Sequence, residues 1–358
     1  MNRGLKTISF NIPNVNVSAN IELKNIYSRA ANVIGQIVSR NHKYRDEYIV
    51  IGAHFDHLGY GGAHSGSLEM HSSAIHNGAD DNASGVAVVL SAGAELIRIP
   101  RQRGVVLAFW SGEELGLLGS ADFVKMQVVR MDQVVAYLNF DMVGRMRDTK
   151  LTVQGVGTST IWTKLIKDTN MSFTFDLSLI RDPYLPTDIL SFNRMNIPSV
   201  GFFTGSHDDY HRPSDIASTI NYHDLDRIAE FAILVSERLA NLNEPPEFIE
   251  VERHLRSVER TNLRVSTGTI PDYASATEGL LLAGVIDGGP ADEAGLREGD
   301  VIIEFNDRPV KSNNDLVSIV IATKPDTTVP VKVIRDKEAV TLQITVEDDL
   351  FCHGASCH

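Results

Sequence analysis

Four short apolar runs in the first two-thirds of the chain predict buried strands. They lie at 48–53, 105–110, 134–140 and 199–203. Continuous apolar runs of this length are typical of strands that are covered on both faces of a sheet. A dense run of small and apolar residues at 84–97 predicts a buried helix, and residues 225–239 have the spacing of an amphipathic helix. The alternation of strands and helices predicts a mainly parallel sheet sandwiched by helices, an α/β fold.

The same patterning divides the chain into regions. Near the start, 32–38 and 48–53 flank a polar turn and predict an antiparallel hairpin. The Pro245-Pro246 pair cannot continue a helix and marks a domain boundary. We expect a first domain at 1–243, with 1–20 as the remnant of a truncated preceding domain, a linker at 244–262, a small α+β domain of short strands and one helix at 263–348, and a tail at 349–358.

Polar side chains follow each of the four predicted strands. His54 and Asp56 follow the first, Glu113 and Glu114 the second, Asp141 the third, and a loop ending at His211 the fourth. Ligands of open α/β sheets bind beyond the carboxyl ends of the strands, so we expect these side chains to converge. Imidazoles and carboxylates in these proportions suit two neighbouring divalent cations, a standard device for hydrolysis.

Two acidic pairs strengthen this interpretation. Asp80 and Asp81 stand just before the predicted helix at 84–97, where a helix cap would need only one of them. Glu113 and Glu114 also have an ordinary alternative, as a solvated first turn favoured by the helix dipole. Adjacent carboxylates repel each other unless a cation neutralises them, which favours metal binding for both pairs.

Composition limits the possible partners. The 358 residues are 43% hydrophobic and 22% charged, with a net charge of -13, which argues against nucleic acid or an anionic membrane as the main partner. No apolar stretch is long enough to span a bilayer, and the first ten residues lack the apolar core of a signal peptide. Cys352 and Cys357 stand with two histidines at a spacing that fits no closed zinc site well, so we expect a disordered or added tail there.

With these motifs in this order, residues 32–239 resemble the M28 family of zinc metallopeptidases. The matching segments are 52–59, 77–85, 111–116 and 139–144. The resemblance implies two Zn²⁺ ions, bridged by Asp80, with His54 and Asp141 completing one site and Glu114 and His211 the other. It implies that Glu113 is the general base, that Asp56 supports His54, that Tyr210 stabilises the oxyanion, and that the peptide between Asp80 and Asp81 is cis. We assign the other nearby histidines, His57, His64, His71 and His76, to a polar loop above the site rather than to the metals.

The second domain resembles a PDZ domain of the bacterial protease type. The resemblance rests on 278–286, Gly289-Pro290-Ala291, Ala294-Gly295-Leu296 and 299–302. It implies that backbone amides in the loop Gly279, Leu280, Leu281 and Leu282 hold the carboxylate of a peptide or protein C-terminus, which adds a strand to the sheet. The alternative is that this domain only packs against the first or supports a dimer.

These observations together predict a two-zinc exopeptidase, most simply an aminopeptidase acting on peptides with a free N-terminus. A carboxypeptidase or dipeptidase would need a cation for the substrate carboxylate, for which Arg181, Arg194 and Arg212 are candidates. A single-zinc glutaminyl cyclase-like acyltransferase and a PDZ adaptor with an inactive first domain are further alternatives. The resemblance implies an extracytoplasmic, periplasmic or secreted protein.

Overall fold

The computed structural model describes residues 29–62, 65–69, 72–252, 265–271, 279–285, 289–311 and 313–348. The expected remnant at 1–20 and the tail with Cys352 and Cys357 lie outside the described residues. Within the described ranges, no helix is long and apolar enough to cross a membrane. The domain limits expected from the sequence stay predictions.

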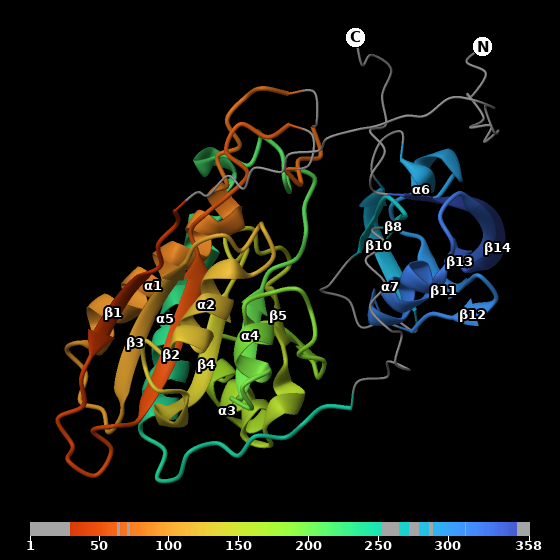
Figure 1. The fold of residues 1–358 in the computed structure, drawn as a ribbon. Coiled ribbons are helices and arrows are strands. Elements are labelled where there is room, and N and C mark those ends of the chain that lie inside the picture. Colours follow the sequence, from red (N-terminus) through yellow and green to blue (C-terminus); the bar gives the residue numbers. More distant parts are fainter. Residues whose placement is uncertain are drawn as a thin grey trace, which may run out of the picture. The chain divides into compact units, whose positions relative to one another are not determined.

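A seven-stranded mixed sheet with helices on both faces forms the first domain (Figure 1). Its strands are β1 (Val33–Ile37), β2 (Tyr48–His54), β3 (Gly104–Trp110), β4 (Val134–Phe140), β5 (Lys150–Gln154), β6 (Asp176–Ile180) and β7 (Ser199–Phe203). Its helices are α1 (Gly85–Leu96), α2 (Leu118–Met126), α3 (Ile161–Asn170), α4 (Ile189–Asn193) and α5 (Tyr222–Ala240), with the short turns η1 (Ala79–Ser84), η2 (Met131–Gln133), η3 (Val156–Thr158) and η4 (Ala217–Thr219). The strand order is β1-β3-β2-β4-β7-β5-β6, and β3, β2, β4 and β7 run parallel.

Each central strand contributes to two hydrophobic layers because successive side chains point to opposite faces. Ile49 and Ile51 of β2 belong to the layer that contains residues of α1, α3 and α5. Val50, between them, belongs to the opposite layer, with Phe123 of α2 and Phe192 of α4. All of β2 is buried, which is why its sequence is apolar throughout instead of alternating.

The strands predicted from the four apolar runs are all present, but the predicted hairpin is wrong. β1 pairs antiparallel with β3, and β2 lies between β3 and β4. The partly exposed pattern of β1 is that of an edge strand, and such a pattern specifies a buried face without specifying a partner. The helix predicted at 225–239 begins earlier, at Tyr222, because the side chain of Asn221 accepts a hydrogen bond from the backbone N–H of Asp224 (3.2 Å).

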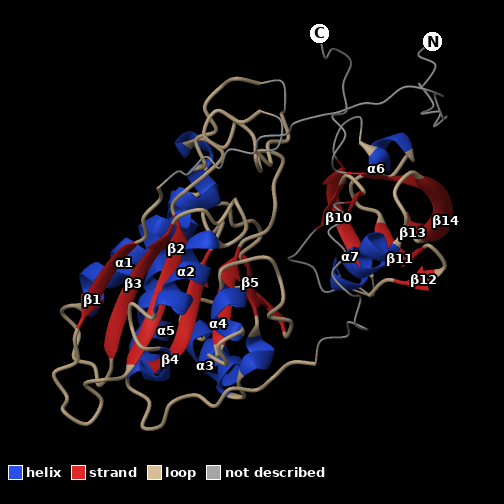
Figure 2. Ribbon diagram, in the orientation of Figure 1, coloured by secondary structure: helices blue, strands red, loops and turns tan. Residues whose placement is uncertain are grey.

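The strands of the second domain form a sheet (Figure 2) in which all described pairs are antiparallel. This domain has its own hydrophobic core. Its elements are β8 (Val265–Ser266), β9 (Thr269–Pro271), β10 (Leu280–Val285), α6 (Pro290–Glu293), β11 (Val301–Phe305), β12 (Arg308–Pro309), α7 (Asn313–Ala322), β13 (Thr327–Arg335) and β14 (Glu338–Asp348). The strand order is β8-β14-β13-β11-β10-β9. Ile302, Val331 and Ile344 lie at the centre of the core and are fully buried.

The expected peptide-binding loop lies at the start of β10. Leu280 and Leu281 of β10 pair with β11, and the pairing with β9 runs from Leu282 to Val285. The role of the loop in peptide binding stays a prediction.

Candidate metal centre

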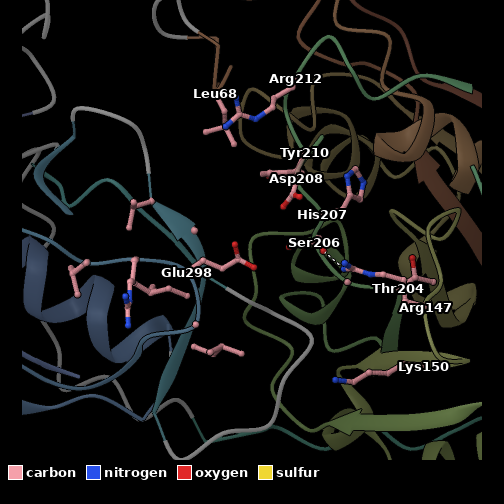
Figure 3. A pocket seen from close by; sticks show the side chains of 18 of the residues that line it. Leu68, Arg147, Lys150, Thr204, Ser206, His207, Asp208, Tyr210, Arg212 and Glu298 are labelled. Atoms are coloured by element: carbon pink, nitrogen blue, oxygen red, sulfur yellow. Dashed lines mark hydrogen bonds between the residues drawn. The ribbon is translucent and has the colours of Figure 1, made fainter. Parts of the chain in front are cut away.

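The predicted site residues converge at one edge of the first domain's sheet. β3, β2, β4 and β7 are parallel neighbours, so their carboxyl ends lie together. His54 is the last residue of β2, Asp141 follows β4, and Glu113 and Glu114 lie in the loop beyond β3. The loop after β7 carries His207, Tyr210 and Arg212, with Arg147 donating a hydrogen bond to the carbonyl of Ser206 (Figure 3). His211 lies in the same loop, with a positive φ of 53°.

The carboxylate of Asp81 lies at the centre of the cluster. Its Oδ1 is 3.2 Å from Nε2 of His54, and its Oδ2 is 3.3 Å from Nε2 of His211. Asp141 Oδ1 is 3.3 Å from the same nitrogen of His54. Glu114 Oε2 is 3.2 Å from Nε2 of His211. Two sets of three side chains therefore share Asp81, one with His54 and Asp141 and the other with Glu114 and His211.

The donor atoms in these sets fit divalent zinc. Ligand atoms placed tetrahedrally at zinc distances lie about 3.3 Å from one another. The nitrogen–oxygen separations in both sets are 3.2–3.3 Å. Each histidine also donates its other ring nitrogen to a backbone carbonyl: His54 Nδ1 to Asp56 (3.1 Å) and His211 Nδ1 to Gly66 (2.8 Å). These bonds leave Nε2 as the lone-pair nitrogen of a neutral ring, which is the form that binds metals.

Asp80, expected to bridge the two ions, does not face this cluster. Its carboxylate accepts hydrogen bonds from the backbone N–H of Gly144 (2.6 Å), from Ser84 Oγ (3.0 Å) and from His207 Nε2 (3.0 Å). These donors already use the oxygens of Asp80, and the backbone directs the next side chain, Asp81, to the histidines. The cis peptide likewise lies between Asp81 and Asn82, not between Asp80 and Asp81.

Glu113 lies beside the cluster, close enough for its carboxylate to share a group with His54 and Glu114. Burial raises the pKa of its carboxyl well above the usual range, against the opposing charge of His54. Asp56 accepts hydrogen bonds from the backbone N–H groups of Glu113 (3.1 Å) and Glu114 (3.3 Å). Asp56 thus holds the turn that presents both glutamates, in addition to lying 3.8 Å from His54 Nδ1.

Without a cation, the imidazoles of His54 and His211 are the positive charges that the described residues place against these carboxylates. Burial lowers the pKa of His211, but Asp81 and Glu114 outweigh it and raise that pKa to about 10. For Asp141, burial raises the pKa of the carboxyl despite His54 nearby. Asp188 is fully buried, and burial raises its pKa to about 7. This concentration of buried carboxylates is the environment that a divalent cation stabilises.

A cavity adjoins the cluster, and Tyr210 is one of the residues that line it. The ring of Tyr210 stacks on that of His211, with centroids 3.8 Å apart. Met142, Leu185 and Phe203 give the same cavity an apolar wall. Among the described residues lining it there is no arginine or lysine.

Sequence reasoning missed two residues of the site. His57 Nδ1 lies 2.7 Å from Glu114 Oε1, in contact with a predicted ligand and not in a loop away from the metals, whereas His64 and His71 lie outside the described residues. Asp215, fully buried, accepts hydrogen bonds from the backbone N–H groups of Asp80 and Asp81, each at 3.0 Å. The sequence did offer one signal for His57: it lies three residues after His54, the last residue of β2, and therefore near the same end of the sheet. Nothing local distinguishes Asp215 from the other aspartates of its loop.

The fold and the cluster define a metallopeptidase domain, and a second domain of PDZ type follows it in the chain. The chain belongs to Peptidase family M28, whose family model matches residues 32–236. A PDZ domain model matches residues 256–346. The family expectations for both domains, and the expected fold class, are confirmed.

Relatives of both domains are known. A leucine aminopeptidase 2 from Trichophyton rubrum is 26% identical over 219 residues, which are 53% of this chain and 41% of that protein. A probable periplasmic serine endoprotease DegP-like from Rickettsia conorii is 44% identical over 73 residues, 20% of this chain and 14% of that protein. The chain spans less than half the length of these curated relatives.

Solved structures share the fold. A zinc aminopeptidase from Bacillus subtilis matches with a TM-score of 0.50 and 23% identity, covering 62% of this chain and 53% of that one. An aminopeptidase from Aneurinibacillus sp. strain AM-1 matches with a TM-score of 0.51 and 22% identity, covering 62% and 50%.

Proposed function

We propose that the first domain is a two-zinc aminopeptidase that hydrolyses the N-terminal residue from peptides. The observation that carries this proposal is the position of Asp81, whose two oxygens face two different histidines at 3.2 and 3.3 Å. His54, Asp81 and Asp141 would hold one ion, and Asp81, Glu114 and His211 the other. One shared carboxylate between two ligand sets is the arrangement expected of paired catalytic ions.

Zn²⁺ held by these residues would supply Lewis-acid chemistry at the scissile carbonyl and would lower the pKa of water there. Glu113, which lies beside His54 and Glu114, takes the proton of the attacking water and returns it to the departing amine. Asp56 keeps Glu113 in place through the backbone of the turn. Tyr210, which lines the adjoining cavity, donates a hydrogen bond to the developing oxyanion.

The lining of the cavity favours an aminopeptidase over a carboxypeptidase or dipeptidase. A substrate carboxylate needs a cationic partner, and the described lining contains no arginine or lysine. Arg212, one of the three candidates, lies 3.7 Å from Glu69 in an ion pair. Carboxylates around the cluster suit the ammonium of a free N-terminus. The apolar wall of Met142, Leu185 and Phe203 suits an apolar first side chain.

A complete second ligand set argues against the single-zinc acyltransferase and against an inactive first domain. Glu114 and His211 are both present and face each other at 3.2 Å. A single-zinc enzyme or an inactive domain would not need Glu114 and His211 as metal ligands.

For the second domain, we propose that backbone amides of Gly279, Leu280, Leu281 and Leu282 hold the carboxylate of a peptide or protein C-terminus, which adds a strand to the sheet. Among the described pairings, β9 meets β10 only from Leu282 to Val285. Main-chain hydrogen bonds to the added strand supply affinity with little demand on sequence. The PDZ family match supports peptide binding by this domain.

We also propose an extracytoplasmic location, periplasmic or secreted. The support is a relative named as periplasmic, which matches 20% of this chain.

The function is tested by elemental analysis of zinc together with release of free amino acid from paired peptides. The peptides carry leucine at the N-terminus, one with a free amine and one N-acetylated. Two zinc ions per chain and cleavage of only the free peptide are expected. Cleavage of both peptides, or release of the C-terminal residue, would overturn the aminopeptidase assignment, and one ion per chain would overturn the two-zinc site.

A further inference from the structure

His57 touches the oxygen of Glu114 that the zinc ligand set does not use. Its Nδ1 lies 2.7 Å from Glu114 Oε1, whereas the other oxygen, Oε2, lies 3.2 Å from His211 Nε2. The 2.7 Å contact is short for a nitrogen–oxygen pair and has the length of a charge-assisted hydrogen bond. The distance from the same nitrogen to Asp81 Oδ2 is 4.0 Å, too long for a hydrogen bond. His57 therefore contacts one carboxylate of the cluster, on one specific oxygen.

The surroundings of His57 fix this geometry. Its side chain is 9% exposed, and its ring meets that of His211 edge-on, with centroids 5.8 Å apart. A Cβ at Gly78, where φ is +60°, would lie 2.7 Å from Cγ of the ring. Glycine at 78 therefore lets the imidazole lie against the segment that leads to Asp81. The other ring nitrogen, Nε2, has no hydrogen-bond partner among the described residues, so Glu114 is the polar contact that orients the ring.

The other ligands of the proposed zinc site are held in a comparable way. His54 is fixed by the carbonyl of Asp56, and His211 by the carbonyl of Gly66. Hydrogen bonds to the non-binding atom of a ligand fix its orientation and commonly change metal affinity by about 10- to 100-fold. Glu114 receives its bond of this kind from His57.

We propose that His57 is a positioning residue for one of the two metal positions, the one formed by Asp81, Glu114 and His211. By donating Nδ1–H to Oε1, it directs Oε2 of Glu114 to the ion. The other position, at His54 and Asp141, receives no contact from His57 and is independent of it. This inference rests on the proposed two-zinc function.

The test compares three variants of the full chain. His57→Phe removes the donor and keeps a ring of similar size. His57→Asn keeps an N–H donor close to the position of Nδ1. His76→Phe is the matched control, because His76 lies in the same segment, 6.4 Å from His57 between ring centroids, and bonds Ser67 (2.7 Å) instead of a cluster carboxylate.

Metal-free protein is titrated with Zn²⁺ in competition with a chromophoric chelator, which yields both dissociation constants, and its urea midpoint is recorded. We expect His57→Phe to weaken one zinc affinity by about 10- to 100-fold and to leave the other within about threefold. His57→Asn should restore most of the loss, and His76→Phe should retain both affinities.

Unchanged zinc affinities in His57→Phe would overturn the inference and leave the two-zinc function intact. Equal weakening of both ions with a lower urea midpoint would overturn it as well, because that pattern marks a general structural role. A wild-type protein that binds one ion would overturn the proposed function together with this inference.

Discussion

Alanine substitutions of Asp80 and Asp81, made one at a time, separate anchoring of the site from metal binding. Asp80→Ala removes the acceptor of the Gly144 N–H and of His207 Nε2. Ser84 Oγ keeps a second acceptor, the backbone carbonyl of residue 80 (2.7 Å). Asp81→Ala leaves neither histidine of the cluster without a partner, because His54 still contacts Asp141 and His211 still contacts Glu114.

The magnitudes follow from these contacts. Each buried donor left without an acceptor costs about 1–3 kcal/mol, so Asp80→Ala should lower the free energy of unfolding by about 2–6 kcal/mol. Asp81→Ala should lower the stability of metal-free protein less than Asp80→Ala, because no buried donor loses its last partner and the lost attraction to His211 is offset by relief of the repulsion with Asp141 and Glu114. Zinc binding should show the opposite order: Asp81→Ala removes a ligand from both metal positions, whereas Asp80→Ala removes none.

Urea unfolding of the metal-free chain, followed by tryptophan fluorescence, measures the stability. Both tryptophans, Trp110 and Trp162, are buried in the first domain, so the signal reports on that domain. Elemental analysis of the folded variants measures zinc. The reasoning is refuted if Asp80→Ala loses zinc at an unchanged urea midpoint while Asp81→Ala retains two ions. Asp80→Asn, which keeps one carbonyl oxygen, is the control and should lose less stability than Asp80→Ala.

Three further predictions concern charges in and beside the cluster. Glu113→Gln should keep zinc content and urea midpoint but lower kcat by about 10²- to 10⁴-fold, because the amide cannot accept the proton of water; turnover within tenfold of wild type would contradict its role. The pKa of His211, about 10 without a cation, lies above the ordinary value of 6.5, so its contribution to metal-free stability is complete below pH 6.5 and is lost as pH rises through 10. Zinc binding at pH 8 should therefore release a proton, seen as a dependence of the calorimetric heat on buffer ionisation enthalpy, and identical heats in two buffers would count against this. The pKa of Asp188 is raised from 3.8 to about 7, so its contribution to stability is complete below pH 3.8 and is lost as pH rises through 7. Asp188→Asn should raise the urea midpoint of metal-free protein more at pH 8 than at pH 5, and an equal change at both would rule out this cause.

The strands that carry the site could be predicted because burial on both faces leaves a distinct signal. β2, β3, β4 and β7 are continuous apolar runs, and the polar residues that end them mark the sheet edge where ligands collect. The pairing of β1 could not be predicted in this way. Its partner, β3, is distant in sequence, and nothing in its own residues distinguishes β3 from β2.

The roles of adjacent acidic residues could be assigned only once the path of the backbone was known. The sequence offers Asp80 and Asp81 as equivalent carboxylates, and the choice between them is made by contacts from far along the chain. Asp215 holds both backbone N–H groups, and Gly144 and His207 bind the side chain of Asp80. The same holds for the second domain, where the position of β10 inside the sheet depends on pairing with β9 and β11.

The place of β7 in the sheet has a consequence for biosynthesis. β7 follows every other strand of its sheet in the sequence, yet it lies between β4 and β5 and pairs with both. In the described sheet, β1 to β4 and the pair β5–β6 are connected through β7, so a nascent chain that has not reached Ser199 lacks the strand that pairs with both groups. The loop after this strand also supplies His211. The stretch from Ser199 to His211 therefore supplies both the strand that joins the sheet and the last side chain of the proposed metal position at Asp81, Glu114 and His211, so that position can form only after synthesis has passed His211.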